Sequence, residues 1–576
     1  KDLIENEKVE IVGSGYSQII GPLVPYEVNI KNHQIGLDYY KKILAITPKT
    51  VLVNEMAFSN DMAEIYQEIG YENMIMDGDN LSLSLGKKKS DFFQTKYGVG
   101  NKKEKLIKLL PTDSIIFQKF QRVAHSEISI NEYIDYLYKI LSKKNNIVFP
   151  LYCNDAEVFN FRPGRFSEEA QIEFDEWEII KNILEIIKNL DNHQIEFPRD
   201  ICNSWKDDEL EIFYINNLSY PVPVKKQKKY NLARWSVTGR DDANLNSSCY
   251  TIYNELIKTS NKNYDDWLNL LFLWSSDHRT HLTSSKWKNI KKLLQEDRPN
   301  NHIEEFYIND SNKDLSKYIL NEKQYINIST EHLFIKLNKN KGMAIMDLGP
   351  IKEGDNTCLV GTIEHGAFDN IELGADFFSG ALVIQNMDTS QLFSDLQKVE
   401  PIIKFTDKKI EISCKLKIKN EKKIKKIEIS LDKPIIKFSY DLSKLVQSKE
   451  TIRLSAATIK TKDLKNIDFN VRSKAGGKKT HEYILDREFN HGSAVSHRVS
   501  STSGLPSTDG RLIFNVNNST FSISWDPAFC YFYPLFLNNL DSNGQLIRLH
   551  LSHREQDDTL KYEGKYKKLE YSIDFS

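Results

Sequence analysis

Two acidic residues, Glu55 and Asp155, each follow a short apolar run that predicts a buried parallel strand. Residues 50–53 (Thr-Val-Leu-Val) lead into the first, and residues 147–153 lead into the second. In folds built from repeating strand–helix units, catalytic groups gather at the carboxyl ends of the strands. A carboxylate is costly to desolvate there, so it usually does chemistry or binds an ion. The competing interpretation of either residue alone is a helix N-cap or an acid in a surface loop.

Two carboxylates at one barrel mouth can divide the work of cleaving a glycosidic bond. One attacks the anomeric carbon, and the other gives its proton to the leaving oxygen. The separation that distinguishes retaining from inverting enzymes is not set by the sequence. Glu157 lies two residues beyond Asp155 and shares its face on an extended segment. It is therefore a second candidate for the acid/base, or a group that holds Asp155 or a sugar hydroxyl.

Other kinds of catalytic site lack their motifs in this sequence. There is no GxSxG, Walker loop, GxGxxG or HExxH pattern. The six cysteines are scattered, and the thirteen histidines lack the spacing of metal ligands. His278 and His281 lie three residues apart beside Asp277, but three neighbouring residues alone make a poor metal site. We therefore predict neither a metal nor a cofactor.

Further residues near the predicted strand ends are candidates for holding sugar hydroxyls. For each of them, an exposed loop position or a salt bridge is the competing interpretation. Tyr16 and Trp274 are the preferred stacking surfaces, because a pyranose presents an apolar C–H face to an aromatic ring. The polar candidates are Gln18, Asp77, Asp79, Arg122, His125, Glu157, Arg162, Asp277 and His278.

Composition is that of an ordinary globular protein and gives no global indication of binding to nucleic acid or to an anionic membrane. The 576 residues are 40% hydrophobic and 27% charged, with a net charge of −2 from 78 basic and 80 acidic residues. Nothing global points to nucleic acid, and the lysine runs at 87–89 and 225–229 are interpreted as solvated loops. No apolar stretch reaches membrane-spanning length, and none resembles a signal peptide. With scattered cysteines, this favours a reducing, cytoplasmic location.

Hydrophobic patterning predicts three regions in an α/β fold class. Residues 1–235 alternate apolar runs (10–12, 51–53, 74–76, 114–117 and 148–153) with helical segments such as 59–70, in a barrel-like progression. Residues 236–325 carry apolar side chains at helical spacing and predict a helical bundle. Residues 326–576 alternate apolar and polar positions, as at 408–418 and 426–431, and predict a large antiparallel β-sandwich.

Several motifs, in this order, resemble glycoside hydrolase family 57. Val53-Asn54-Glu55-Met56-Ala57-Phe58-Ser59 resembles its nucleophile motif, and Asn154-Asp155-Ala156-Glu157-Val158-Phe159 resembles its acid/base motif. Trp274-Ser275-Ser276-Asp277-His278 is similar to an element that lines the family's substrate cleft. Residues 12–18 stand where the family has a small-residue loop ending in histidine, and residues 359–368 resemble the start of a mutarotase-type sandwich.

The resemblance implies an incomplete (β/α)7 barrel, a helical bundle and a β-sandwich. It also implies a retaining glycosidase or transglycosidase on an α-linked oligo- or polysaccharide, with Glu55 as nucleophile and Asp155 as acid/base. Three features of this sequence differ from the family's pattern. Gln18 replaces a histidine, His278 replaces a tryptophan, and the family's first strand has no counterpart, so either it lies outside this chain or the barrel is shorter. The alternative is therefore a catalytically impaired carbohydrate-binding or scaffold protein in polysaccharide assembly.

Overall fold

The structure, a computed structural model, divides into two compact units. The first comprises residues 1–15, 33–215 and 223–227, and the second comprises 16–32, 216–222 and 228–576. Within the described ranges, no helix combines the length and apolar character needed to span a membrane. The structure describes residues 1–88, 91–92, 95–100, 106–141, 147–148, 150–160, 175–190, 193–225, 228–259, 263–296, 317–352, 355–364, 366–368, 378–443, 449–561 and 568–576.

The first unit contains a five-stranded, mostly parallel sheet with the order β1-β2-β4-β3-β5. β1, β2 and β4 are parallel, whereas the short β3 runs antiparallel to β4 and parallel to β5. The apolar runs at 51–53 and 74–76 are thus confirmed as neighbouring strands whose carboxyl ends lie at one edge. The strands are β1 (Thr50–Leu52), β2 (Asn73–Asp77), β3 (Tyr97–Val99), β4 (Ile107–Thr112) and β5 (Glu211–Phe213).

Three of the expected strands differ in the structure. Residues 114–117 begin helix α5 (Ser114–Ala124), because the Asp113 side chain accepts hydrogen bonds from the backbone N–H groups of Ile115 and Ile116. The strand of that repeat is β4, seven residues earlier. The described residues of 148–153 pair with no strand, and near 10–12 only Gly13 forms a one-residue bridge to Val51.

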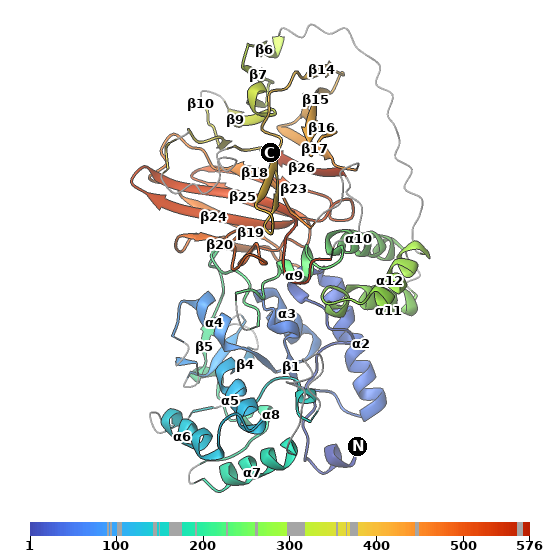
Figure 1. Ribbon diagram of the computed structural model, residues 1–576, viewed down its shortest axis with the longest axis vertical. Coiled ribbons are helices and arrows are strands. Elements are labelled where there is room, and N and C mark those ends of the chain that lie inside the picture. The colour runs from blue at the N-terminus through green and yellow to red at the C-terminus, as the bar shows by residue number, and fades with distance from the viewer. Residues whose placement is uncertain are drawn as a thin grey trace. The chain divides into compact units, whose positions relative to one another are not determined.

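Helices accompany the sheet, and one group forms its own small core. Figure 1 shows α5, α6 and α7 grouped together, and their apolar faces share a cluster that includes Phe120, Tyr133 and Ile183. The helix expected at 59–70 is confirmed, with Gly70 at its end in the left-handed conformation. The remaining helices are α1 (Asp2–Glu5), α3 (Asn60–Ile69), α4 (Gly78–Leu85), α6 (Ile130–Leu141), α7 (Glu176–Lys188) and α8 (Pro198–Asn203).

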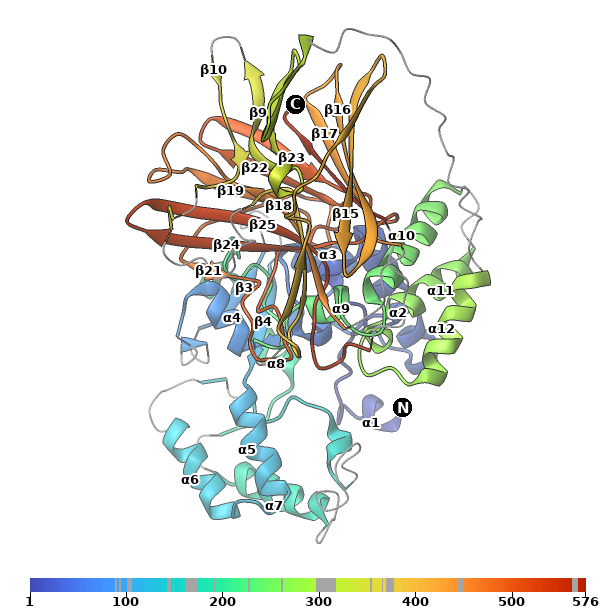
Figure 2. The same ribbon diagram turned by 45° about the horizontal axis from the view of Figure 1, so that its top comes forward.

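The second unit begins with helices, as the spacing predicts. Its helical part packs α10 against α11, and α12 lies beside them (Figure 2). Trp267 and Leu271 of α11 are buried, in agreement with their periodicity. The helices are α9 (Ala233–Ser236), α10 (Asp242–Lys258), α11 (Tyr264–Trp274) and α12 (Ser284–Glu296), and α2 (Tyr26–Leu44) has its first turns in this unit.

Three sheets, antiparallel among the described pairings, make up the rest of this unit, and Figure 1 shows their long strands β18, β24 and β25 side by side. Their strand orders are β10-β9-β8-β7-β6, with β11 on β9, β13-β12-β18-β25-β24-β21, and β14-β15-β16-β17-β26-β23-β22-β19-β20. The alternating runs at 408–418 and 426–431 are confirmed as parts of β15 and β16, which pair along ten residues each.

The strand bounds are β6 (Ile319–Asn321), β7 (Tyr325–Ser329), β8 (Leu333–Asn338), β9 (Ala344–Lys352), β10 (Asp355–Asn356), β11 (Val360–Gly361), β12 (Ala381–Asn386), β13 (Gln391–Ser394), β14 (Ile402–Phe405), β15 (Lys409–Ile418), β16 (Glu421–Ser430), β17 (Ile435–Asp441), β18 (Thr451–Thr458), β19 (Phe469–Ser473), β20 (His481–Ile484), β21 (Phe489–Asn490), β22 (Arg511–Val516), β23 (Ser519–Ser524), β24 (Tyr533–Asp541), β25 (Gly544–Arg554) and β26 (Lys568–Asp574). Inward side chains of all three sheets share one hydrophobic core.

A buried histidine of this unit makes its stability sensitive to pH. Phe536 donates its backbone N–H to Nδ1 of His491 at 3.1 Å, and Nε2–H of His491 donates to the Ser219 carbonyl at 3.2 Å. This arrangement requires the neutral ring, and burial lowers the pKa of His491 from 6.5 to about 4.

We expect the second unit to lose stability as the pH falls from 6.5 towards 4. Over that window the unfolded chain binds a proton at this ring and the folded chain does not, which costs about 2 kcal/mol between pH 7 and pH 5. Thermal unfolding at pH 7 and at pH 5 measures this loss of stability. His491→Gln should remove the part of the pH dependence that this ring contributes, whereas exposed His497→Gln should leave the pH dependence unchanged. Equal pH dependence in both variants would contradict the assignment.

Candidate functional site

Glu55 lies in a tight turn at the carboxyl end of β1. The turn is a 3-10 segment (Asn54–Met56) in which Glu55 and Met56 both have left-handed backbone angles, with φ of +50° and +54°. Non-glycine residues rarely adopt this conformation, and such strain is concentrated at functional sites. Asn54 fixes the turn, because its side-chain amide donates to the Ser14 carbonyl at 2.9 Å.

A strap formed by residues 223–225 crosses the ends of β1 and β2. Lys225 donates its backbone N–H to the Glu55 carbonyl at 3.2 Å, and its ammonium group forms an ion pair with the Glu55 carboxylate. Asn80, at the start of α4, donates its side-chain amide to the Val224 carbonyl at 2.5 Å. The Glu55 side chain is 18% exposed, so this cation neutralises a largely buried carboxylate. Lys225 is therefore not the solvated loop residue that its lysine run predicts.

Asp155 is exposed at the start of a second short turn (Ala156–Val158). The turn is held at both sides. Tyr152 donates its hydroxyl to the Asp155 carbonyl at 2.8 Å, and Phe159 is buried among the side chains of α5, α6 and α7. Asn160 donates its backbone N–H to the buried Glu176 at 2.7 Å. The Asp155 carboxylate is thus presented to solvent from an anchored segment.

Cys153 connects this turn to the end of β2. Burial, together with the nearby negative charges of Asp77 and Asp155, raises the pKa of the Cys153 thiol to about 11. Both aspartates therefore lie within electrostatic range of one thiol, and the thiol itself stays protonated and unreactive at neutral pH. The thiol thus lies near Asp77 at the end of β2 and near Asp155 in the turn.

The structure gives several sequence candidates other roles. Asp77 caps α4 by accepting from the Asp79 N–H, and Asp79 accepts from the Ser114 N–H at 3.0 Å. His125 lies 2.7 Å from Glu176, in a pair with little solvent exposure, and helps to hold the Asp155 turn. In the same region, Arg122 forms an exposed pair with Glu127, Glu157 is exposed, and Arg162 lies outside the described residues.

The second unit brings two other motifs together. Ser276 donates its backbone N–H to the Gln18 carbonyl at 2.8 Å, and Ile19 forms an antiparallel bridge with Ser275. Tyr16, Gln18 and Asp277 are exposed on these segments. His278 is buried and its Nδ1 bonds the Phe272 carbonyl at 2.8 Å, while burial lowers its pKa.

Trp274 is a core residue, and this corrects its prediction as an exposed stacking surface. Only 3% of the residue is exposed, and its ring packs edge-on against Tyr250 with a centroid distance of 5.2 Å. The helical spacing that placed it next to a polar motif equally fits the buried face of α11. Nothing in the local sequence separates these two positions.

Trp274→Ala should therefore lower the free energy of unfolding by about 3–5 kcal/mol, because it leaves a cavity among packed rings. Denaturant titration followed by tryptophan fluorescence measures it. Tyr264→Ala on the same helix, where the tyrosine is 49% exposed, is the matched control and should cost far less. If the two variants were equally stable, Trp274 would not be a core residue and would again be a candidate ligand contact.

Among the described residues, no group of three or more His, Cys, Asp or Glu side chains could hold a metal ion. In the β-rich part, Glu364 of the mutarotase-like segment 359–368 is exposed, and residue 365 of that segment lies outside the described residues. The mutarotase-type assignment therefore stays a prediction.

Solved structures resemble this chain at low identity. The 4-alpha-glucanotransferase from Thermococcus litoralis is 13% identical, with 99% of this chain and 88% of that one covered and a TM-score of 0.40. A GH57-type branching enzyme from Pyrococcus horikoshii is 12% identical over 51% of this chain and 64% of that one, with a TM-score of 0.35. An alpha-mannosidase from Enterococcus faecalis V583 is 8% identical, covers 100% and 79%, and reaches a TM-score of 0.54, which indicates a shared fold.

Sequence comparison locates the family more directly. No curated protein matches the chain. A family model described as "Glycosyl hydrolase family 57" matches residues 1–198, a range that contains both Glu55 and Asp155. The resemblance of the motifs to this family is therefore confirmed over residues 1–198, the part of the chain that matches the family model.

Proposed function

We propose that the protein is a retaining glycosidase or transglycosidase that acts on α-linked glucan chains by double displacement. Glu55 attacks the anomeric carbon and forms a glycosyl-enzyme. Asp155 first protonates the leaving oxygen and then, as a carboxylate, activates the water or sugar hydroxyl that releases the product. The observation that carries the proposal is Glu55 itself, held in a strained turn at a strand end inside the family match.

The environment of Glu55 suits a nucleophile. The Lys225 ammonium group forms an ion pair with the Glu55 carboxylate and so fixes the position of the attacking group. Lys225 also donates its backbone N–H to the Glu55 carbonyl and so holds the turn in place. The Glu55 carboxylate is therefore oriented before substrate arrives. The same cation can hold a sugar hydroxyl while the carboxylate is esterified.

The environment of Asp155 suits a group that exchanges protons. It is exposed, so protons and the acceptor molecule can reach it, and the anchored Phe159 and Asn160 limit how far its turn can move. Glu157, two residues on and also exposed, supports sugar hydroxyls in this scheme. We further propose that the sheet β1-β2-β4-β3-β5 is the core of an incomplete (β/α)7 barrel, with the helical and β-rich regions as separate domains at 236–325 and 326–576.

The stereochemistry of the product tests this proposal. Incubation with maltoheptaose, followed by proton NMR of the newly formed anomeric centre, should show the α-anomer first. Because double displacement inverts the centre twice, retention is its signature. A β-anomer as the first product would refute it. Binding without turnover, across a panel of α-glucans and α-mannosides, would favour the carbohydrate-binding alternative.

A further inference from the structure

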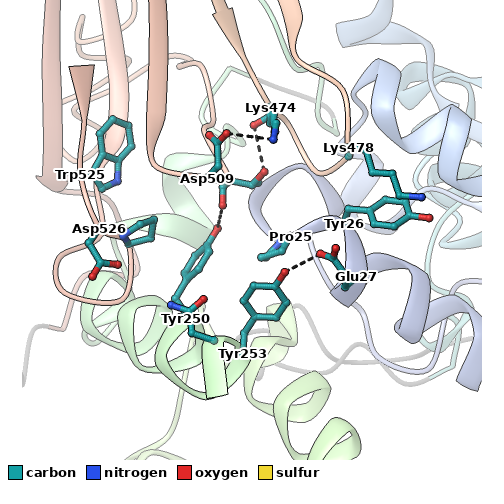
Figure 3. A pocket seen from close by; sticks show the side chains of 14 residues that line it. Pro25, Tyr26, Glu27, Tyr250, Tyr253, Lys474, Lys478, Asp509, Trp525 and Asp526 are labelled. Atoms are coloured by element: carbon teal, nitrogen blue, oxygen red, sulfur yellow. Dashed lines mark hydrogen bonds and ion pairs between the residues drawn. The ribbon is translucent and has the colours of Figure 1, made fainter. Parts of the chain in front are cut away.

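The second unit contains a pocket of about 510 Å³ that neither predicted carboxylate lines. Figure 3 shows that it is framed by the first turn of α2, by one face of α10 and by loops of the β-rich region. Its size is that of pockets that bind small organic ligands.

Aromatic side chains form much of the wall. Tyr250 and Tyr253 are three residues apart on α10 and so share a face, and Tyr26 opens α2. Trp525 follows β23 on the other side of the pocket in Figure 3. Rings of this kind offer apolar surface and, through their N–H and O–H groups, polar edges. Both features suit the C–H faces and hydroxyls of a sugar.

The charged side chains of the pocket are nearly balanced and already engaged. Tyr253 donates its hydroxyl to the Glu27 carboxylate at 2.7 Å, and Lys478 lies over the Tyr26 ring at 4.1 Å from its centre. Two lysines against three carboxylates give a formal charge of 2 − 3 = −1 for Glu27, Lys474, Lys478, Asp509 and Asp526. This balance disfavours a polyanionic ligand and is compatible with a neutral one.

One buried donor lacks a partner. Trp525 is 7% exposed, and its indole N–H has no hydrogen-bond acceptor among the described residues. A buried N–H without an acceptor is costly, and native proteins rarely leave one unless a ligand or water completes it. A sugar hydroxyl oxygen would supply that acceptor once binding turns the indole N–H toward the pocket that Trp525 lines.

The pocket is also fixed before any ligand arrives. The Asn29 side-chain amide donates to the carbonyls of both Gly21 and Gly476, at 2.9 Å each, and so ties the loop that carries Lys474 and Lys478 to the segment before α2. Gly476 has a φ of +104°, and a Cβ there would lie 2.5 Å from the Gly21 carbonyl oxygen. The close approach therefore needs glycine, and it preorganises the site.

We infer that this pocket is a carbohydrate-binding site for a neutral oligosaccharide, formed by Tyr26, Tyr253 and Trp525. The choice of sugar over other neutral polyols rests on the proposed function. A chain bound here would be held by the second unit through contacts other than those of the reacting carboxylates.

Fluorine NMR of the full chain labelled with 5-fluorotryptophan tests the site without relying on catalysis. The Trp525→Phe variant identifies the Trp525 resonance by its disappearance. Titration with maltoheptaose, and separately with an α-linked mannooligosaccharide, should shift that resonance with at least one of the two sugars. Tyr26→Ala should weaken the affinity read from this shift by at least about 5-fold, through loss of ring contact. Phe529→Ala, in the same loop as Trp525 but outside the pocket, should leave it unchanged.

Unmoved positions of the remaining tryptophan resonances in the free Tyr26→Ala protein show that the variant is folded. A Trp525 resonance that responds to neither sugar, or that responds equally in Tyr26→Ala and Phe529→Ala, overturns the inference. The result is separable from the proposed function. If the protein cleaves glucan but its Trp525 resonance does not respond to sugar, only the inference about the pocket is refuted. If the Trp525 resonance responds to sugar and the Glu55→Gln variant keeps full turnover, only the proposed mechanism is refuted.

Discussion

Glu55→Gln should lower turnover of α-glucan by at least about 10⁴-fold, because an amide cannot form the glycosyl-enzyme. The substitution keeps the size of the side chain, and its amide oxygen can still accept a hydrogen bond from Lys225. The fold and the affinity for substrate should therefore persist. Reducing-end release from maltoheptaose, measured beside a thermal melt, separates lost chemistry from lost structure.

The matched control is Glu127→Gln. Glu127 forms an exposed pair with Arg122, in which both side chains are at least half exposed, and such pairs contribute little. This variant should keep the wild-type rate. Wild-type turnover by Glu55→Gln would remove Glu55 from the mechanism.

Asp155→Asn should reduce turnover of unactivated glucans by about 10²–10⁴-fold, the range that a positioned general acid contributes. The loss should be much smaller for formation of the glycosyl-enzyme from a glycosyl fluoride, because fluoride leaves without a proton. Comparing the two substrates by pre-steady-state kinetics therefore tests the acid role specifically. It distinguishes a proton donor from a residue that only binds sugar, whose loss affects both substrates alike.

Glu157→Gln is the control for this experiment, since Glu157 is exposed on the same turn and competes for the same role. It should retain most activity on both substrates. If Glu157→Gln instead shows the leaving-group dependence and Asp155→Asn does not, the two residues exchange roles and the double-displacement scheme stands.

Where the sequence pattern has one interpretation, the fold could be predicted. The period-two runs of β15 and β16 fit only half-buried strands, and the helix expected at 59–70 ends at Gly70, which takes the left-handed conformation of a helix C-terminus. Residues 114–117 (Ser-Ile-Ile-Phe) fit a buried strand or a helix start equally well, and the side chain of Asp113 decides in favour of the helix. Short apolar runs carry no periodicity that separates the two.

The sequence singles out the two candidate carboxylates, but it does not indicate the side chains that contact them. Glu55 and Asp155 stand out because each follows an apolar run. Lys225 is 170 positions from Glu55, and nothing in its lysine run distinguishes the residue that reaches the carboxylate from those beside it. The prediction that Trp274 stacks on a sugar is wrong, because a residue at helical spacing next to a polar motif can face either the core or a cleft, and Trp274 faces the core.

Covalent trapping tests the central claim most directly. The protein is incubated with 5-fluoro-α-glucosyl fluoride, which forms the glycosyl-enzyme and slows its breakdown, and is then digested and analysed by tandem mass spectrometry. We expect one added fluoroglucosyl group, attached to the peptide around Glu55 and absent from the Glu55→Gln protein. A label on another carboxylate, or full inactivation of the enzyme without any covalent adduct, would contradict the account.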